Sequence, residues 1–431
     1  MLSPLPPDFE SYTRSLLGEN LFSAFTKGME EEAPVSIRLN PFKCKDGEYK
    51  VVDADKRVEW CPNGYYLRKR PNFTFDPFLH AGLYYVQEAS SMFIDYAIRE
   101  ILQRMGDKSE QGLTVLDLCA APGGKSTCTM SALPKGSLLY SNEPIRNRAN
   151  ILNENIQKFG NPDIIVTNCY ARDYARSGMK FDIILTDVPC SGEGMFRKDA
   201  GAIAEWSTKK VEQCAELQRE IVSDIWSCLK PDGYLIYSTC TLNAHENEEN
   251  IEWIAHTFDA EHFDLLVEPD QWGIITNLSE EYKHNFHFPF YRFMPGRTRG
   301  EGLFVSVLQK HDGRYEDSLP NVERKKNSNK KGASRTLVPT YPRTIEGISP
   351  SIPSSPSTKT SLSYSQAIAY LRGEAIVLPP DTPRGIIDVT FEGATLGKVK
   401  NIGNRANNLY PKEWRIKSTY IPDYEPILKK I

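Results

Sequence analysis

The chain has 431 residues, of which 40% are hydrophobic and 25% are charged, and this length allows two or three domains of ordinary size. It contains no apolar run long enough to cross a membrane and no signal-peptide pattern at its start, so we expect a cytoplasmic protein. Nine scattered cysteines without a CxxC pair predict reduced thiols rather than disulfides, and argue against a zinc site or any other bound metal.

The net charge of −4 is unevenly distributed along the chain. Residues 311–431 carry 19 Lys and Arg against 12 Asp and Glu, a balance of +7, which leaves −11 for residues 1–310. A basic C-terminal part on an acidic body favours a polyanionic partner for that part. The simpler alternative is a solvated charged tail.

The first 90 residues combine two kinds of pattern. Apolar residues at helical spacing in residues 6–29 predict one or two helices, and "VSIRLNPFK" (35–43) predicts a strand. We therefore expect a small α+β N-terminal domain over residues 1–90.

From about residue 112 apolar strands alternate with amphipathic helices. The predicted strands are 113–120, 136–143, 163–169, 181–187 and 234–240, with a closing edge strand near 301–310. The predicted helices between them include 144–160, 209–230 and 247–258. Such alternation predicts an α/β fold with a doubly wound, mostly parallel sheet over residues 91–310.

The C-terminal part changes character twice. Residues 311–362 are rich in Lys, Asn, Ser and Pro, which predicts a flexible linker. From 363 to 431 the pattern becomes ordered again, with predicted strands at 385–391 and 395–403. We expect a small β-rich module there.

A glycine-rich turn follows the first core strand, in "LDLCAAPGGKST" (116–127). Gly123 and Gly124 allow a ligand to approach the backbone closely, although the spacing is neither a Walker loop nor GxGxxG. Glu143 closes the second strand, where an acid can bind the two hydroxyls of a ribose. The alternative for Glu143 is an acid that favours the start of the helix after Pro144.

Two thiols end the last two parallel strands. "IILTDVPC" places Asp187 and Cys190 at one strand end, and "YSTC" places Cys240 at the next. A thiolate that adds to C6 of a pyrimidine makes C5 nucleophilic, and Asp187 is placed to hydrogen-bond ring N3. Six other cysteines are expected to be ordinary buried thiols that act as small hydrophobic residues. They are Cys44, Cys61, Cys128, Cys169, Cys214 and Cys228.

Four motifs in this order resemble the NOL1/NOP2/sun family of RNA (cytosine-5)-methyltransferases, and most resemble its bacterial RsmF branch. They are "YYVQEASSM" (84–92), "LDLCAAPGGKST", "DVPCSGEGMFRK" and "YSTCTLNAHENE". The resemblance implies a Rossmann-like core that binds S-adenosyl-L-methionine, an RNA-binding N-terminal domain and a PUA-like RNA-binding C-terminal module. It also implies methylation of small-subunit (16S) rRNA, free or in the 30S subunit, by a protein that we expect to be a monomer.

The resemblance also assigns roles. Cys240 is the implied nucleophile, and Cys190 is implied to assist loss of the C5 proton and departure of Cys240. Asp187 is implied to border both the cofactor and the target base. Lys125 is implied to lower the pKa of a nearby thiol or to orient the base. The implied cofactor-binding residues are Cys119, Ala120, Ala121, Pro122, Gly123, Gly124, Lys125, Glu143 and Asp187. The alternatives are the same chemistry on tRNA, or a ribosome-assembly factor without catalysis. The intact cysteines, Asp187 and glycine turn argue against the latter.

Several further residues are candidate contacts. Many relatives place an acid near the cofactor adenine after the third strand, but this chain has Tyr170 there, with Asp173 three residues later, so that contact stays open. Arg197 and Lys198 are candidates for phosphate binding, with a plain solvent-exposed loop as the alternative. Candidate RNA contacts in the C-terminal part are Lys398, Lys400, Arg405, Tyr410, Lys412, Trp414, Arg415 and Lys417, together with the lysines of 324–335.

Overall fold

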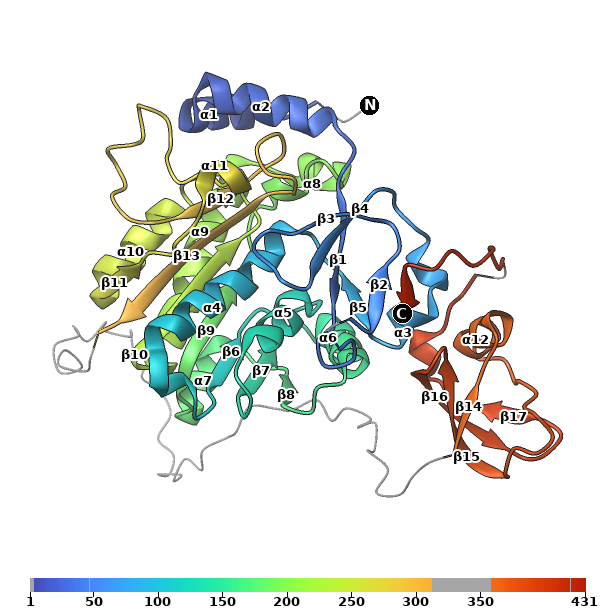
Figure 1. The fold of residues 1–431 in the computed structure, drawn as a ribbon. Helices are drawn as coiled ribbons and strands as arrows, with labels where there is room; N and C mark the ends of the chain where they lie inside the picture. Colours follow the sequence, from blue (N-terminus) through green and yellow to red (C-terminus); the bar gives the residue numbers. More distant parts are fainter. Residues whose placement is uncertain (1–3, 46, 312–357, 419) are drawn as a thin grey trace, which may run out of the picture.

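The structure, a computed structural model, describes residues 4–45, 47–311, 358–418 and 420–431. Its central sheet has the strand order β11-β13-β10-β9-β6-β7-β8, and β12 also pairs with β13 (Figure 1). The strands are β6 (Thr114–Asp117), β7 (Leu138–Asn142), β8 (Ile164–Thr167), β9 (Phe181–Asp187), β10 (Leu229–Thr239), β11 (Ala260–Phe263), β12 (Tyr291–Phe293) and β13 (Leu303–Lys310).

The five strands from β6 to β10 are parallel, which confirms the doubly wound fold. The chain winds from β6 through β7 to β8 on one side, then returns to place β9 and β10 on the other side of β6. The order of strands therefore reverses between β6 and β9. Ligands in such sheets bind at the carboxyl ends of the strands at this reversal, where Asp117 and Asp187 end their strands.

The prediction that the strand near 301–310 closes the edge of the sheet is wrong. β13 lies inside the sheet, antiparallel to β10 on one side and to β11 on the other. Nearly every residue of β13 is buried, as expected for a strand with neighbours on both sides. β11 covers its free edge, but the short sequence "AEHF" of β11 carries no clear apolar alternation that would reveal it.

Helices cover both faces of the sheet (Figure 1). Buried side chains of α4, α5 and α6 share one core with the strands, and those of α7, α9 and α10 share another. The helices of the domain around this sheet are α4 (Phe93–Met105), α5 (Gly124–Ala132), α6 (Arg146–Phe159), α7 (Ala171–Ser177), α8 (Ala200–Glu205), α9 (Thr208–Ile225), α10 (Glu248–Phe258) and α11 (Pro269–Trp272).

The first 90 residues divide between two cores. Helices α1 (Pro7–Leu17) and α2 (Glu19–Glu30) pack through their phenylalanines on Phe196, Leu242 and Met294 of the central domain. The strands that follow form a separate sheet with the order β3-β4-β1-β5. Its elements are β1 (Val35–Leu39), β3 (Ala54–Arg57), β4 (Gly64–Leu67), α3 (Pro77–His80) and β5 (Tyr84–Val86).

The C-terminal module is a four-stranded sheet with one helix. Its elements are β14 (Lys359–Ser361), α12 (Tyr364–Leu371), β15 (Gly385–Phe391), β16 (Ala394–Asn401) and β17 (Ala406–Asn408). Because β14 pairs with β15, ordered structure begins before residue 363, where the linker was expected to end. The rest of the expected linker, 312–357, including its lysines at 324–335, lies outside the described residues.

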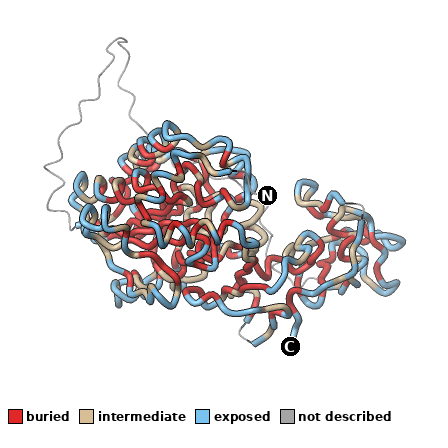
Figure 2. Tube along the Cα trace, turned by 90° about the horizontal axis from the view of Figure 1, so that it is seen from above, coloured by how far each residue is buried: buried red, intermediate tan, exposed pale blue. Residues whose placement is uncertain are grey.

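The N-terminal sheet and the C-terminal module share one hydrophobic core. Phe78 packs edge-on against Phe391 with ring centroids 5.4 Å apart. At the end of the chain, β18 (Leu428–Lys430) pairs with β2 (Tyr49–Val51). From above, buried segments fill a large body and a smaller lobe and continue through the junction between them (Figure 2).

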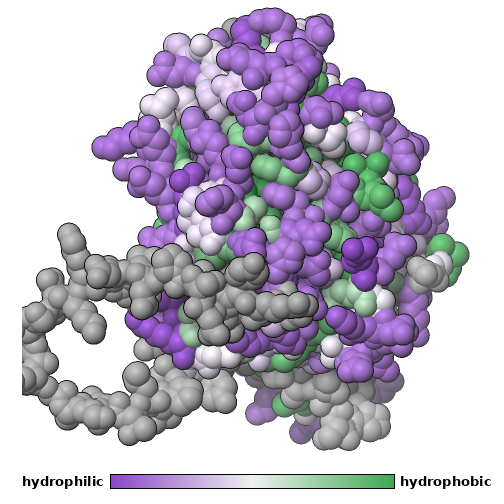
Figure 3. All heavy atoms as spheres, turned by 90° about the vertical axis from the view of Figure 1, so that its left-hand side faces the viewer, coloured by the Kyte–Doolittle hydropathy of each residue, from purple (hydrophilic) through white to green (hydrophobic). Residues whose placement is uncertain are grey.

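One face of the molecule, on the left in Figure 1, is covered mainly by hydrophilic side chains with small separate apolar patches (Figure 3). Every helix in the described part of the chain is too short or too polar to cross a membrane.

Candidate active site

The glycine-rich turn joins β6 to α5 as predicted. Gly123 has φ of 111°, a left-handed conformation that favours glycine. A Cβ on Gly123 would lie 3.1 Å from Cδ1 of Leu152, and one on Gly124 would lie 3.3 Å from the Tyr85 ring. These glycines therefore allow α6 and the N-terminal sheet to pack closely on the turn, which is a reason that the sequence did not reveal.

The N-terminal sheet holds the start of α5 through Arg38, which is 1% exposed. Its Nε donates to Oε1 of Gln87 at 2.8 Å, and its Nη2 donates to Oγ1 of Thr127 at 2.6 Å. The Nε2 group of Gln87 is buried beside the turn without a hydrogen-bond partner. Sequence reasoning missed Arg38 because a single arginine in a strand carries no motif.

Two buried carboxylates follow the ends of β6 and β7. Oδ1 of Asp117 and Oε2 of Glu143 accept no hydrogen bond, although Nη1 of Arg148 lies 3.4 Å from the latter. Burial raises the pKa of Asp117 to about 7. The other Glu143 oxygen accepts from the backbone of Ile145 at 3.0 Å, so the carboxylate also fulfils the alternative role at the start of α6.

These unpaired acceptors fit a nucleoside cofactor. Ribose hydroxyls are donors, and a buried carboxylate oxygen without a donor is the complementary group. The turn itself is tied to α6, since Asn155 Nδ2 donates to the Pro122 carbonyl at 2.8 Å and Arg148 Nη2 donates to that of Ala121 at 3.2 Å. The segment 119–125 is therefore fixed between two helices and the N-terminal sheet.

Lys125 and Asp187 form an ion pair at the mouth of the crevice. Lys125 Nζ lies 2.7 Å from Oδ2 of Asp187, whose Oδ1 accepts from Ser238 Oγ at 3.0 Å. Burial disfavours the charge of Lys125, but the neighbouring carboxylate outweighs it and raises the pKa of the ammonium group. Lys125 therefore keeps its positive charge at neutral pH, beside the strand ends that carry the thiols.

The two strand-end thiols meet. Sγ of Cys190 lies 3.0 Å from Sγ of Cys240, because β9 and β10 are adjacent and parallel. The hydrogen bond to the Cys240 sulfur raises the pKa of the Cys190 thiol well above its usual value, and burial adds to this effect. Cys190 therefore keeps its proton at neutral pH.

Two buried glutamates fix the loops that carry these thiols. Glu193, in the Cys190 loop, accepts the backbone N–H groups of Leu242 and Asn243 at 2.8 and 2.9 Å. Glu246, in the Cys240 loop, accepts the backbone N–H of Ser191 at 3.0 Å. Each loop thus holds the other through a carboxylate, and Asn243 Nδ2 donates to both glutamates at 3.0 and 2.8 Å.

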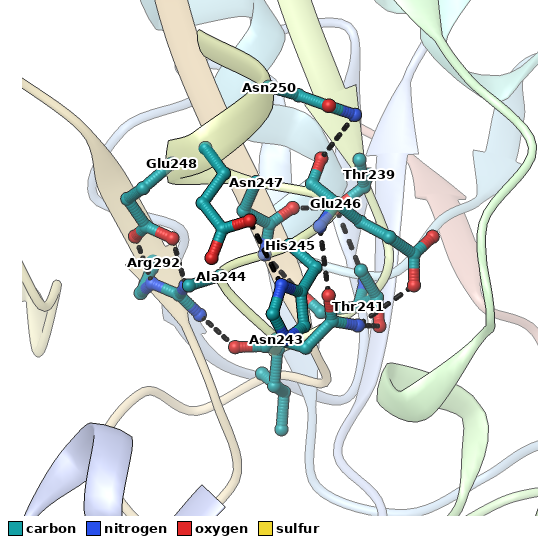
Figure 4. Close-up of polar contacts among 12 residues, drawn as sticks. Thr239, Thr241, Asn243, Ala244, His245, Glu246, Asn247, Glu248, Asn250 and Arg292 are labelled. Carbon is teal, nitrogen blue, oxygen red and sulfur yellow. Dashed lines mark hydrogen bonds and ion pairs between the residues drawn. The ribbon is translucent and has the colours of Figure 1, made fainter. Parts of the chain in front are cut away.

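A buried ion pair lies beside the loop after Cys240 (Figure 4). Arg292, 1% exposed, contacts both carboxylate oxygens of Glu248 and the carbonyl of Leu242. Asn247 Oδ1 accepts from Thr239 Oγ1 at 2.6 Å. The polar residues of "TLNAHENE" therefore shape the loop after Cys240, a function that the motif match alone did not identify.

The structure corrects the expectation for Arg197. Its side chain is 5% exposed, and its Nε donates to Glu301 at 2.9 Å. Its Nη1 and Nη2 donate to the carbonyls of Gly28 and Gly300, both at 2.8 Å. It joins α2 to the segment before β13 and is not free for phosphate. Lys198 also lies 3.2 Å from Glu301, with about a third of its side chain exposed.

Tyr170 and Asp173, the two residues after β8 that are candidates for an adenine contact, both interact with their own segment. Tyr170 is 54% exposed and lies beside the Arg172 guanidinium. Asp173 accepts the backbone N–H of Tyr170 at 3.0 Å and so caps its own helix, α7. Of the six cysteines expected to be ordinary buried thiols, Cys214 is the exception, because it is partly exposed.

In the C-terminal module the candidate RNA contacts separate into two groups. Tyr410 is buried between Tyr370 and Trp414, so it has no free face for a base. Lys398 pairs with Asp388 at 2.9 Å, and Lys158 of α6 lies over the Trp414 ring at 5.3 Å. Arg415 is partly buried, and the exposed basic residues are Lys400, Arg405, Lys412 and Lys417.

Among the described residues no group of His, Cys, Asp and Glu is arranged to hold a metal ion. Burial raises the pKa of the Cys119 thiol far above its usual range. That thiol is therefore not a second nucleophile in the crevice.

Three family models match successive parts of the chain. The model for 16S rRNA methyltransferase RsmB/F matches residues 106–309. The model for the N-terminal domain of 16S rRNA methyltransferase RsmF matches residues 5–89, and that for the methyltransferase RsmF PUA domain matches residues 357–416.

Similar proteins support this match. A protein named ribosomal RNA small subunit methyltransferase F from Photobacterium profundum is 32% identical over 71% of this chain and 64% of its own length. The chain thus spans less than two thirds of the length of that relative. A protein of the same name from Shewanella loihica is 27% identical over 88% of both chains.

A methyltransferase homolog protein from Pyrococcus horikoshii, known from a crystal structure, is 28% identical and superposes with a TM-score of 0.56 over 70% of this chain and 94% of that one. Models of the catalytic part and of both flanking parts match in the expected order and together cover most of the chain. The chain therefore belongs to the RsmB/F family, in its RsmF branch.

Proposed function

We propose that this protein uses S-adenosyl-L-methionine to form 5-methylcytosine in the 16S rRNA of the small ribosomal subunit. The observation that carries the proposal is the pair of thiols at the ends of β9 and β10, 3.0 Å apart, beside Lys125 and Asp187. Methylation of an amino nitrogen needs no thiol, whereas C5 of cytosine becomes nucleophilic only after a nucleophile adds to C6.

The geometry at the strand ends supports the proposed cofactor-binding residues. The turn 119–125 offers backbone groups at a strand-to-helix junction, and Glu143 and Asp117 offer unpaired carboxylate oxygens. S-adenosyl-L-methionine bound there supplies an electrophilic methyl group. Asp187 stands between this site and the thiols, since it contacts Lys125 on one side and Ser238 of β10 on the other.

Cys240 is the proposed nucleophile. Its sulfur lies 3.0 Å from that of Cys190, and the charged Lys125 lies near it. The Cys240 thiolate adds to C6, and the Asp187 carboxyl group, once it has taken a proton from Lys125 Nζ, donates a hydrogen bond to N3 as negative charge develops there. The target base leaves its stack to reach these groups.

Cys190 is proposed to act in product release. After C5 has been methylated, its proton passes to solvent, the C5–H electron pair forms the C5–C6 double bond, and the C6–S electron pair leaves with the Cys240 sulfur. The protonated Cys190 thiol then stabilises the departing thiolate by the hydrogen bond that the structure contains. A thiol that keeps its proton suits this role better than that of the attacking group.

A denaturing gel tests these roles by following covalent protein–RNA adducts with S-adenosyl-L-methionine and purified 30S subunits. Cys190→Ala should accumulate an adduct that migrates slowly, whereas Cys240→Ala should form none and transfer no methyl group. Cys214→Ala, which removes a partly exposed thiol on α9, is the control and should behave as wild type.

Other outcomes would change the proposal. An adduct that accumulates in Cys240→Ala would exchange the two roles. Methyl transfer that persists in both variants would exclude thiol catalysis. Wild-type methylation of tRNA in preference to 30S subunits would keep the chemistry and change the substrate.

A further inference from the structure

Helix α9 carries one buried polar side chain, Gln218, which is 0% exposed. The other buried residues of this helix are Val211, Ala215, Val222 and Ile225, all of them apolar. An amide group on such a face costs free energy unless its hydrogen bonds are made within the protein. The partners of Gln218 therefore indicate what it does.

All four hydrogen-bonding positions of the Gln218 amide are used. Its Nε2 donates to the Pro189 carbonyl at 2.9 Å and to Oε2 of Glu246 at 2.8 Å. Its Oε1 accepts from the Tyr237 hydroxyl at 2.9 Å and from Nδ2 of Asn250 at 2.7 Å. Because a backbone carbonyl can only accept, Nε2 must face Pro189, and the orientation of the amide is fixed.

Two of these contacts hold the backbone on both sides of Cys190. The Pro189 carbonyl belongs to the peptide group that precedes Cys190, and Gln218 holds it directly. The Ser191 N–H belongs to the peptide group that follows, and it donates to Glu246 Oε2 at 3.0 Å, the same oxygen that accepts from Gln218. With both peptide groups held, the backbone torsions of Cys190 are set, and these limit the directions in which its Sγ can point.

The backbone of Cys240 is held by a different contact. Its carbonyl accepts the N–H of Gly194 at 2.9 Å. Gln218 reaches the strand of Cys240 through the hydroxyl of Tyr237, and that hydroxyl has a second acceptor at 2.6 Å. Loss of the amide therefore leaves the tyrosine with a partner, whereas the carbonyl before Cys190 loses its donor. The effect of such a loss falls first on Cys190.

We propose that Gln218 is a positioning residue for product release, which directs the Cys190 thiol toward Cys240. The two sulfurs lie 3.0 Å apart, and a hydrogen bond weakens steeply when its length and angle depart from the favourable range. A small rotation of Cys190 would therefore remove the S–H from the departing thiolate. The inference rests on the proposed function, since it assigns a further residue to one step of that reaction.

The test is Gln218→Met in the full chain, because methionine has a similar length and makes none of these hydrogen bonds. The first turnover of methyl transfer to 30S subunits should stay within about threefold of wild type, whereas steady-state turnover should slow about tenfold or more. The covalent protein–RNA adduct should accumulate on a denaturing gel, as for Cys190→Ala. The affinity for S-adenosyl-L-methionine should match that of wild type.

A second variant, Gln218→Glu, covers the case in which Gln218→Met does not fold. A glutamate keeps the shape of the side chain and an acceptor for Tyr237 and Asn250, but it has no N–H donor for the Pro189 carbonyl. The same separation of the first turnover from later turnovers is expected.

Oxidation by diamide gives a readout that needs neither RNA nor cofactor. Diamide takes two electrons and two protons from a pair of neighbouring thiols, which become a disulfide while diamide becomes a hydrazine. Peptide mass spectrometry then measures how fast Cys190 and Cys240 are joined. Because a disulfide requires a specific geometry, this link should form about fivefold or more slowly in Gln218→Met than in wild type.

The matched control is Gln213→Met, which changes the same residue type on the exposed face of α9 and should behave as wild type. A first turnover that falls as much as steady-state turnover in both Gln218 variants, or a disulfide that forms in them at the wild-type rate, would overturn the inference. A wild-type protein that methylates no RNA, together with slower disulfide formation in Gln218→Met, would overturn the proposed function and leave the positioning of Cys190 standing.

Discussion

The catalytic crevice and the junction between the N-terminal sheet and the C-terminal module place their functionally suggestive side chains in opposite ways. In the crevice, Cys190, Cys240 and Asp187 lie at the ends of adjacent strands and are partly exposed. At the junction, Tyr410 and Trp414, aromatic residues suited to stacking on bases, pack on protein instead.

The difference teaches how far a residue type indicates a function. The position of a strand end is set by the fold, so a chemically reactive residue there is directed into the cleft. No such rule directs an aromatic residue in a small β module, because its own core is short of apolar surface and takes up the aromatic side chains. Positive charge left over at the surface is then the better guide to an RNA contact.

Glu193→Gln should have the largest effect. The carboxylate accepts the backbone N–H groups of Leu242 and Asn243 on one oxygen, and Trp206 Nε1 at 2.9 Å on the other. A glutamine must turn an N–H₂ group toward one of these sets of donors. Loss of buried charged hydrogen bonds should lower the free energy of unfolding by about 3 kcal/mol and kcat by tenfold or more.

Denaturant unfolding and single-turnover methyl transfer measure both quantities. Glu205→Gln, which changes an exposed glutamate of α8, is the control and should alter neither. Unchanged catalysis in Glu193→Gln would show that the two loops keep the thiols in place without this carboxylate.

Tyr410→Ala distinguishes packing from base stacking at the junction. Because the ring is 4% exposed and contacts Tyr370 and Trp414, its removal should lower the free energy of unfolding by about 3 kcal/mol. Tyr410→Phe loses only the contact of the hydroxyl with His80 Nδ1 at 3.3 Å, and should cost about 1 kcal/mol. Weaker RNA binding in Tyr410→Ala without a change in stability would restore the stacking role.

Low pH should also destabilise the junction between the N-terminal sheet and the C-terminal module, by less than Tyr410→Ala does. Burial lowers the pKa of His80 to about 4, below the value near 6.5 of an unfolded chain. Between these values the unfolded state binds the proton and the folded state does not, so stability is full above pH 6.5 and falls as the pH decreases toward 4. The loss should be roughly 1–2 kcal/mol, because the ring is partly exposed.

The comparison of wild type with His80→Gln isolates this contribution. Asp76 on the same segment has its pKa raised to about 6 by burial and contributes with the opposite sign, but it is present in both proteins. Denaturant unfolding at pH 7 and at pH 5 should show a smaller decrease for His80→Gln. Equal decreases in the two proteins would contradict the prediction.

Much of the fold and of the site is predictable from sequence. The alternation of strands and helices identified the parallel sheet, and the motifs placed the glycine turn, Glu143 and both strand-end thiols. The position of β13 was wrong, because an apolar strand buried on both faces reads alike at an edge and inside a sheet. Arg197 was misjudged, since a basic residue after a catalytic loop gives no sign of a buried acid far away in sequence.

The sequence by itself determined the class of chemistry, because strand periodicity and strand-end residues are local properties of the chain. Only the tertiary structure decided how close the sulfurs of Cys190 and Cys240 lie, which carboxylates hold their loops, and which basic residues remain free. These depend on contacts between segments far apart in sequence, such as Glu193 with Leu242 or Arg197 with Gly28. The charge and geometry of a buried group are set by its neighbours in space, and a linear pattern does not record them.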